Sequence, residues 1–139
     1  VYQKCVPRLE DLFKNAGEVH DRFAGKIQGI AKATGGRAIV APLKGMERAK
    51  GKASFKYKDR RNGRIGWHRL TDLERATIAY ATIDEMYKGL AHLVGLGMDI
   101  IEFNDRFQRP LPGGYMDLQL CVRVEGHACE LQLNIETML

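Results

Sequence analysis

The stretch LQLCVRVEGHACELQLNI, residues 118–135, decides the fold of this chain. Apolar and polar residues alternate through much of both halves, which is typical of strands with one buried face. The Glu125-Gly126 pair between the halves is a turn signal, so the stretch is predicted to form an antiparallel hairpin. Its second strand places Glu130, Gln132 and Asn134 together on one face.

Around this hairpin, the hydrophobic pattern predicts three helices and two more strands. Apolar residues at three- and four-residue steps mark the first helix, and the Gly35-Gly36 pair ends it. Pro42 stands where a second helix could begin, and Thr82 or Asp84 can cap the third. The helices are predicted at residues 7–33, 43–57 and 83–94, and the further strands at residues 73–81 and 98–107.

The order helix, helix, strand, helix, strand, strand, strand predicts an α+β fold, with a mixed sheet of about four to five strands flanked by helices. The 139 residues are 45% hydrophobic and 28% charged, which indicates one globular domain, 1–139. We expect a helical part at 1–35 and a functional part at 36–139. Because the chain starts at Val1, we also expect it to be excised from a longer protein. No apolar run is long enough to cross a bilayer, so no membrane partner is expected.

The three cysteines, Cys5, Cys121 and Cys129, show no CxxC spacing. This pattern argues against a disulfide framework and against a zinc site. Cys121 and Cys129 lie in apolar stretches, so they are predicted to be core residues of a protein in a reducing compartment.

Positive charge is concentrated in residues 44–69, although the net charge of the whole chain is only +5. Lys44, Arg48 and Lys52 follow at i, i+4 and i+8, so they share one face of the predicted second helix. Like charges at this spacing repel one another, and a polyanion would offset that cost. The block therefore predicts binding of nucleotide phosphates or nucleic acid, with a solvated basic face as the alternative.

Two carboxylates could hold a hard metal ion. Asp72 precedes one predicted strand, and Glu130 lies on the polar face of another. Magnesium prefers one or two carboxylates together with substrate phosphate oxygens. Taken singly, Asp72 is better interpreted as a cap or turn residue and Glu130 as a solvent-exposed strand residue. The neighbouring Arg75 is then a partner in a surface ion pair with Glu74 or Asp72.

The loop before residue 118 contains Pro110, Pro112 and the pair Gly113-Gly114, and Tyr115 follows directly. A tyrosine held at the end of such a loop can stack on a planar base. The alternative is a tyrosine that anchors the loop to the core.

These segments occur in a characteristic order. Together they resemble the synthetase domain of RelA/SpoT-like alarmone enzymes, over roughly residues 36–135. Each segment is weak evidence alone, and the resemblance depends on their order and spacing. The matching segments are 44–52, 70–78, 105–107 leading to 112–118, and 126–133.

The resemblance implies a nucleotidyltransferase-like synthetase fold and an ATP-dependent pyrophosphokinase, which transfers pyrophosphate to the 3′ hydroxyl of a nucleotide. It implies Mg²⁺ as cofactor and ATP as donor. The resemblance also implies a role for each site residue. Asp72 and Glu130 are expected to be catalytic and to bind the metal. ATP is expected to be bound by Lys44, Arg48, Lys52 and Arg75, and the acceptor by Tyr115, Arg106 and Gln132.

The sequence departs from the family pattern mainly around the acceptor. Ile39 stands where a lysine of the ATP motif is expected, Gln119 replaces a histidine, Met116 replaces a glutamine or arginine, and Asn134 replaces an arginine. The acceptor is therefore left open between GDP or GTP, ADP or ATP, and the 3′ end of tRNA. A non-catalytic RNA-binding or regulatory domain is the alternative from another class.

Divergent members of this superfamily include toxins. The resemblance thus implies action in the bacterial cytoplasm, delivery as a secreted effector as one route, and an immunity or antitoxin protein as a partner.

Overall fold

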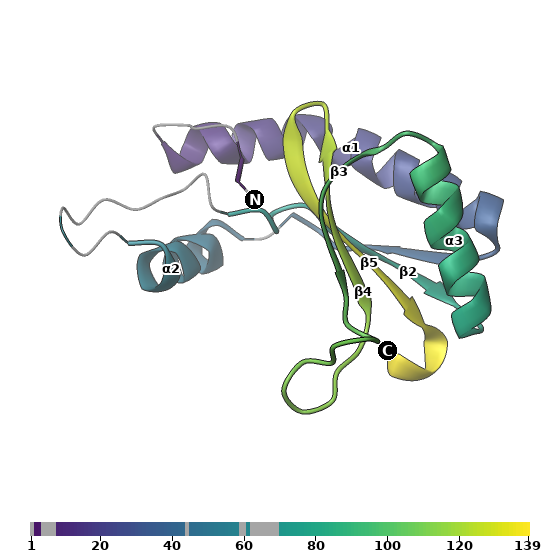
Figure 1. Cartoon of the computed structure of the whole chain (residues 1–139). Coiled ribbons are helices and arrows are strands. Elements are labelled where there is room, and N and C mark those ends of the chain that lie inside the picture. Colours follow the sequence, from purple (N-terminus) through teal and green to yellow (C-terminus); the bar gives the residue numbers. More distant parts are fainter. Residues whose placement is uncertain (1, 4–7, 44, 59–60, 62–69) are drawn as a thin grey trace.

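The computed structural model describes residues 2–3, 8–43, 45–58, 61 and 70–139. It confirms the α+β prediction, and both strands of the decisive hairpin have the predicted bounds (Figure 1). The elements are α1 (Leu9–Thr34), β1 (Arg37–Val40), α2 (Met46–Lys56), β2 (Arg75–Tyr80), α3 (Ile83–Gly95), β3 (Asp99–Asp105), β4 (Leu118–Val124), β5 (His127–Ile135) and a short 3-10 helix, Glu136–Met138.

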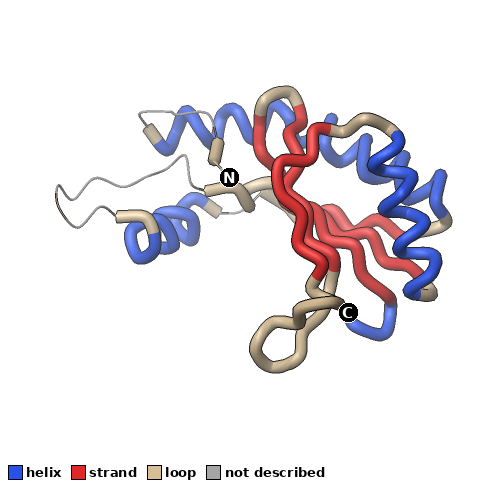
Figure 2. The backbone as a smooth tube through the Cα atoms, in the orientation of Figure 1, coloured by secondary structure: helices blue, strands red, loops and turns tan. Residues whose placement is uncertain are grey.

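The five strands form one mixed sheet in the order β1-β2-β5-β4-β3 (Figure 2). The pair β2–β5 is parallel, and the other three pairs are antiparallel. β1 is absent from the predicted element order. Its four residues are too few to show a clear period, and pairing with β2 holds them in the sheet. α2 begins at Met46, three residues after the predicted start.

α1 and α3 cover one face of the sheet, and this interface holds the main core. Burial of these apolar side chains is the main driving force for folding. The core contains Phe23, Ile27 and Ile30 of α1, Met86 and Leu93 of α3, and Ala76, Ile78, Tyr80, Leu118, Leu120, Val122, Cys129, Leu131 and Leu133 of the sheet. Cys121 and Cys129 are both buried, as predicted, and burial raises the pKa of their thiols to about 11 and about 12.

α2 lies away from the main core (Figure 1). Its buried Ala49 and Ala53 belong to a second apolar cluster with Leu12 of α1 and with Leu70 and Leu73, which precede β2. This cluster holds the basic helix beside the start of β2.

Local signals explain where the helices end and how closely they pack. Gly35 adopts φ +74° and ends α1, and Thr82 accepts a hydrogen bond from the backbone N–H of Glu85 at 3.1 Å, so it caps α3. Gly89 lets α3 approach the sheet, because a Cβ there would lie 2.3 Å from the Tyr80 hydroxyl. None of the described helices is long and apolar enough to span a membrane.

Candidate active site

The face of the sheet opposite α1 and α3 carries polar side chains in rows across the strands. Paired positions on neighbouring strands point to the same face. The register aligns Arg75 of β2 with Glu130 of β5, and Glu130 with Cys121 of β4. The next row contains Thr77, Gln132, Gln119 and Asn104.

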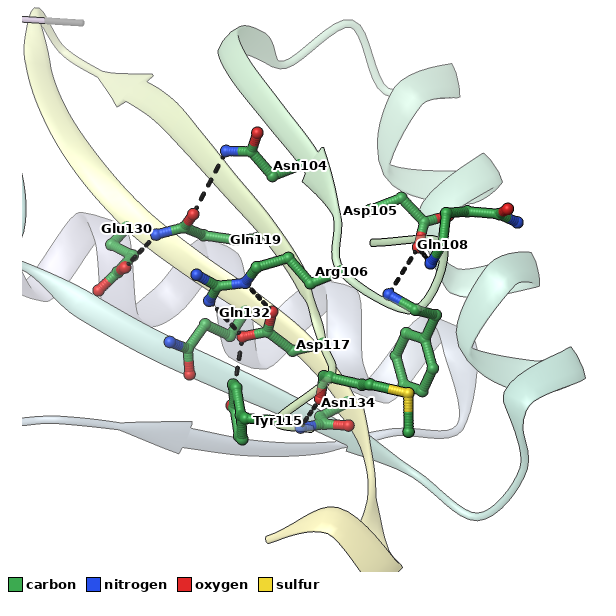
Figure 3. Close-up of polar contacts among 12 residues, drawn as sticks. Asn104, Asp105, Arg106, Gln108, Tyr115, Asp117, Gln119, Glu130, Gln132 and Asn134 are labelled. Atoms are coloured by element: carbon green, nitrogen blue, oxygen red, sulfur yellow. Dashed lines mark hydrogen bonds and ion pairs between the residues drawn. The ribbon is translucent and has the colours of Figure 1, made fainter. Parts of the chain in front are cut away.

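Glu130 is half-buried in this face rather than fully exposed. Its Oε1 accepts a hydrogen bond of 2.7 Å from Nε2 of Gln119, whose own Oε1 accepts one of 3.3 Å from Asn104 (Figure 3). The two amides fix the orientation of the carboxylate. A cavity of about 40 Å³ is lined by both Glu130 and Thr71, so the segment that carries Asp72 reaches the neighbourhood of Glu130.

Asp72 lies beside α2, where its Oδ2 accepts a hydrogen bond of 2.7 Å from Nζ of Lys52. The residue predicted to bind ATP phosphates therefore contacts the residue predicted to bind magnesium. The backbone N–H of Glu130 donates to the carbonyl oxygen of Glu74 at 2.9 Å, which extends the β2–β5 pairing towards Asp72. Asp72 thus lies shortly before Arg75, the β2 residue that pairs with Glu130 of the parallel strand β5.

Arg106 and Tyr115 meet at the buried carboxylate of Asp117 (Figure 3). Arg106 donates from Nε to Oδ1 at 2.5 Å and from Nη2 to Oδ2 at 2.8 Å, and the Tyr115 hydroxyl donates to Oδ2 at 3.2 Å. The hydrogen bond to Asp117 raises the pKa of the Arg106 guanidinium. Burial, reinforced by the Asp117 charge, raises the pKa of the Tyr115 hydroxyl.

The other predicted site residues are more scattered. Arg48 is exposed on α2, and Gln132 accepts a hydrogen bond of 3.3 Å from the Thr77 hydroxyl. The Nε of Arg75 is buried without a hydrogen-bond partner among the described residues, which is unusual for a donor. Lys44 lies outside the described residues, so its predicted role stays a prediction.

The position of Glu74 contradicts one part of the alternative considered for Arg75, a surface ion pair with Glu74. Glu74 is buried, and its Oε2 lies 2.7 Å from Nδ1 of His20 on α1. Burial raises the pKa of Glu74, and the contact with His20 opposes that shift. Sequence reasoning also gave no role to Asp117. Its position in the Tyr-Met-Asp segment after two glycines was the only signal available.

The site suits a magnesium ion that takes two ligands from protein carboxylates and the others from substrate, rather than an ion held by protein ligands alone. No three His, Cys, Asp or Glu side chains gather into a metal-binding group within the described part of the chain. Asp72 and Glu130 both offer the hard oxygen ligands that Mg²⁺ takes, and substrate phosphates would complete its shell.

A larger cavity of about 510 Å³ lies beside this face, next to Arg106. Arg106 and Gln119 line it, together with Phe103, Asn104, Asp105, Gln108, Arg109 and Leu111. Its volume is in the range of small-molecule sites.

No protein-family model and no curated protein matches the chain. Several solved structures do. The Type VI effector Tas1, solved in complex with its immunity protein, is 26% identical with a TM-score of 0.71, and the match covers 94% of this chain and 62% of that chain. The chain therefore spans less than two thirds of that effector.

Two synthetases from Bacillus subtilis are also similar. Small alarmone synthetase 1, bound to its product pppGpp, is 14% identical with a TM-score of 0.72, and the match covers 93% of this chain and 73% of that one. Small alarmone synthetase 2 is 19% identical with a TM-score of 0.63, covering 94% and 71%. With its five-stranded mixed sheet and the predicted motifs in order along it, this chain has the RelA/SpoT-like synthetase fold.

Proposed function

We propose that this chain transfers pyrophosphate from ATP to the 3′ hydroxyl of a nucleotide, with Asp72 and Glu130 holding Mg²⁺. The observation that carries the proposal is the position of these two carboxylates. In a fold shared with alarmone synthetases, Asp72 lies just before β2 and beside the basic helix α2, and Glu130 of the adjacent parallel strand β5 pairs with the first residue of β2.

The donor side is formed by α2 and the start of β2. Lys52 and Arg48, with Lys44 as a further predicted ligand, provide cations for the triphosphate of ATP. Arg75 adds a buried donor without a partner in the described part of the chain, in register with Glu130. Bound phosphate would replace the Asp72 carboxylate as the partner of Lys52, which frees Asp72 for the metal.

The reaction needs little covalent work from the protein. The ribose 3′ oxygen attacks the β-phosphorus of ATP, the bond from that phosphorus to the α–β bridging oxygen breaks, and AMP leaves. Glu130 accepts the hydroxyl proton at the oxygen that does not bind Gln119. Mg²⁺, when bound, neutralises charge on the phosphate oxygens.

The acceptor side contains Tyr115, Arg106 and Gln132, with the ring of Tyr115 available for stacking on a base. The acceptor is GDP or GTP, or ADP or ATP. Similarity to a Type VI effector and to an alarmone synthetase bound to pppGpp supports this class of substrate. The same similarity supports a toxic effector domain that acts in the bacterial cytoplasm and is inhibited by an immunity protein.

Pyrophosphorylation of the tRNA 3′ end is the second candidate. Arg48, Lys56, Lys58 and Arg61 are exposed around α2 and could contact a nucleic-acid backbone. In that case tRNA, rather than a free nucleotide, gains the pyrophosphate. A non-catalytic RNA-binding domain would produce no AMP at all.

The test is Glu130→Gln, which keeps the size of the side chain but removes the charge. We expect it to abolish nearly all conversion of ATP to AMP while the circular dichroism spectrum is unchanged. Glu85→Gln, on the exposed first turn of α3, is the matched control and should keep the wild-type rate. AMP production by Glu130→Gln at the wild-type rate would contradict the assignment.

A further inference from the structure

We propose that Asp117 is the positioning residue of the acceptor site, and that it sets where the acceptor base can stack. The inference rests on the proposed function, because Arg106 and Tyr115 are acceptor-binding residues only within it. Neither the motifs nor the roles implied by the resemblance assign any function to Asp117.

Asp117 is 0% exposed, and its carboxylate has three side-chain donors (Figure 3). Two come from the Arg106 guanidinium at 2.5 and 2.8 Å, and the third is the Tyr115 hydroxyl at 3.2 Å. The backbone N–H of Arg106 also donates to the Asp117 carbonyl oxygen at 2.9 Å. Paired, two-donor contacts of this kind fix the guanidinium plane as well as its position.

A second carboxylate, at the end of β3, shows what a purely structural role looks like. Asp105 accepts from the backbone N–H groups of Phe107 and Gln108 and from the Tyr87 hydroxyl of α3, so it holds the turn and ties it to a helix. The partners of Asp117 are different. Its side-chain partners, Arg106 and Tyr115, are two of the three residues predicted to bind the acceptor.

The geometry limits how a base can bind. The Arg106 guanidinium lies 5.8 Å from the centroid of the Tyr115 ring. A base inserted between them would need about 7 Å, that is, two contacts of about 3.5 Å. Only the other face of Tyr115 is therefore available, and Asp117 determines which face that is.

Asp117 also links the stacking position to the reacting end of the site. The hydrogen bond to Asp117 raises the pKa of the Arg106 guanidinium, and the Glu130 charge adds to that shift. In Figure 3, Arg106 lies between Asp117 and the Gln119–Glu130 pair. By holding Arg106 over one face of Tyr115, Asp117 would keep a base stacked on the other face in a constant position relative to the carboxylate that takes the hydroxyl proton.

The test is equilibrium binding by Asp117→Asn of GDP and ADP, compared with binding of α,β-methylene-ATP as the donor analogue. Loss of a charge-assisted clamp should weaken binding of the acceptor by about 10-fold or more, while binding of the analogue stays within about 2-fold. Ile27→Ala is the control, because it removes core volume under the covered face and leaves the clamp intact. Ile27→Ala should not weaken binding of the acceptor more than binding of the donor analogue, or the reverse.

Tyr115→Phe serves as a second variant, since it removes one hydroxyl and keeps the Arg106–Asp117 pair. We expect it to bind the acceptor about 2- to 10-fold more weakly. A change in salt concentration should restore neither its affinity for the acceptor nor its selectivity between the two ligands. The proposal is overturned if folded Asp117→Asn binds GDP and ADP as the wild type does, or loses both ligand classes equally. If Asp117→Asn does not fold, unchanged acceptor binding by Tyr115→Phe overturns it.

These outcomes can be distinguished from a failure of the proposed function. A wild-type protein that binds nucleotides but transfers no pyrophosphate contradicts the function, while the effect of Asp117→Asn on binding still decides the role of the clamp. A wild-type protein that binds none of these nucleotides contradicts both.

Discussion

Two ion pairs lie near the two ends of the polar face of β5, and they differ in burial and geometry. Lys52 and Asp72 meet through one contact of 2.7 Å, with side chains 26% and 18% exposed. Arg106 and Asp117 meet through two contacts, with side chains 16% and 0% exposed. Each pair joins a cation predicted to bind substrate to a carboxylate.

The difference indicates that the two halves of the site are built for different tasks. A single, partly exposed lysine contact contributes about 0–1 kcal/mol, so phosphate and metal can replace it. A buried two-donor pair is costly to break, since the remaining charge stays uncompensated. We therefore expect the donor side to exchange partners when ATP binds and the acceptor side to stay in place.

The largest expected effect is on the donor side. Asp72→Asn should lower the transfer rate about 100-fold or more, because a metal ligand that acts on developing charge is lost. Its free energy of unfolding should fall by less than that of Asp117→Asn, whose carboxylate is fully buried and held by two contacts from Arg106. Steady-state AMP release and urea unfolding of the same preparation measure both quantities. A large loss of stability would mean that Asp72 is structural.

The next effect separates the two pairs by stability alone. Arg106→Gln removes the cation that compensates the buried Asp117 carboxylate and leaves the Tyr115 hydroxyl as its remaining side-chain donor, so the free energy of unfolding should fall by about 3–5 kcal/mol. Lys52→Gln should lower it by at most about 1 kcal/mol. Urea denaturation at neutral pH measures both variants. Equal losses would remove the distinction on which the comparison rests.

A smaller effect comes from His127. Its contribution to acid unfolding must be measured before acid unfolding is attributed to the Lys52–Asp72 or the Arg106–Asp117 pair. Burial lowers the pKa of His127 to about 4, and its ring nitrogens contact Asn15 at 2.7 Å and Gln3 at 3.1 Å. Between about pH 6.5 and 4 the unfolded chain binds the extra proton, so stability falls as the pH drops, by about 3 kcal/mol in total.

His127→Gln should therefore flatten the dependence of the unfolding free energy on pH between 7 and 4. The raised pKa of Glu74 acts in the opposite direction, because its stabilising contribution is lost as the pH rises. Glu74 is common to both proteins, so subtracting the two curves isolates His127. Parallel curves would show that His127 does not cause the acid sensitivity.

Much of the fold could be predicted because its signals are local. The alternation in β4 and β5, the turn between them, Gly35 after α1 and Thr82 before α3 are all visible in short stretches of sequence. β1 could not be predicted in this way. Four residues carry no period of their own, and only the edge of β2 makes them a strand.

The candidate site shows the same division. The order of the motifs led to Asp72, Glu130 and Tyr115 without any structure. The contact between Lys52 and Asp72, and the burial of Glu74 and Asp117, depend on how distant segments pack. An aspartate beside a Gly-Gly loop resembles a surface turn residue in sequence, and only its burial shows that it holds Arg106.

The most direct measurement incubates the wild-type protein with Mg²⁺ and γ-labelled ATP, together with GDP, ADP or tRNA in separate reactions. Pyrophosphate transfer moves the label to one acceptor and releases one AMP for each label transferred. Release of labelled phosphate without a labelled acceptor, or no consumption of ATP with any of the three, would contradict the central claim.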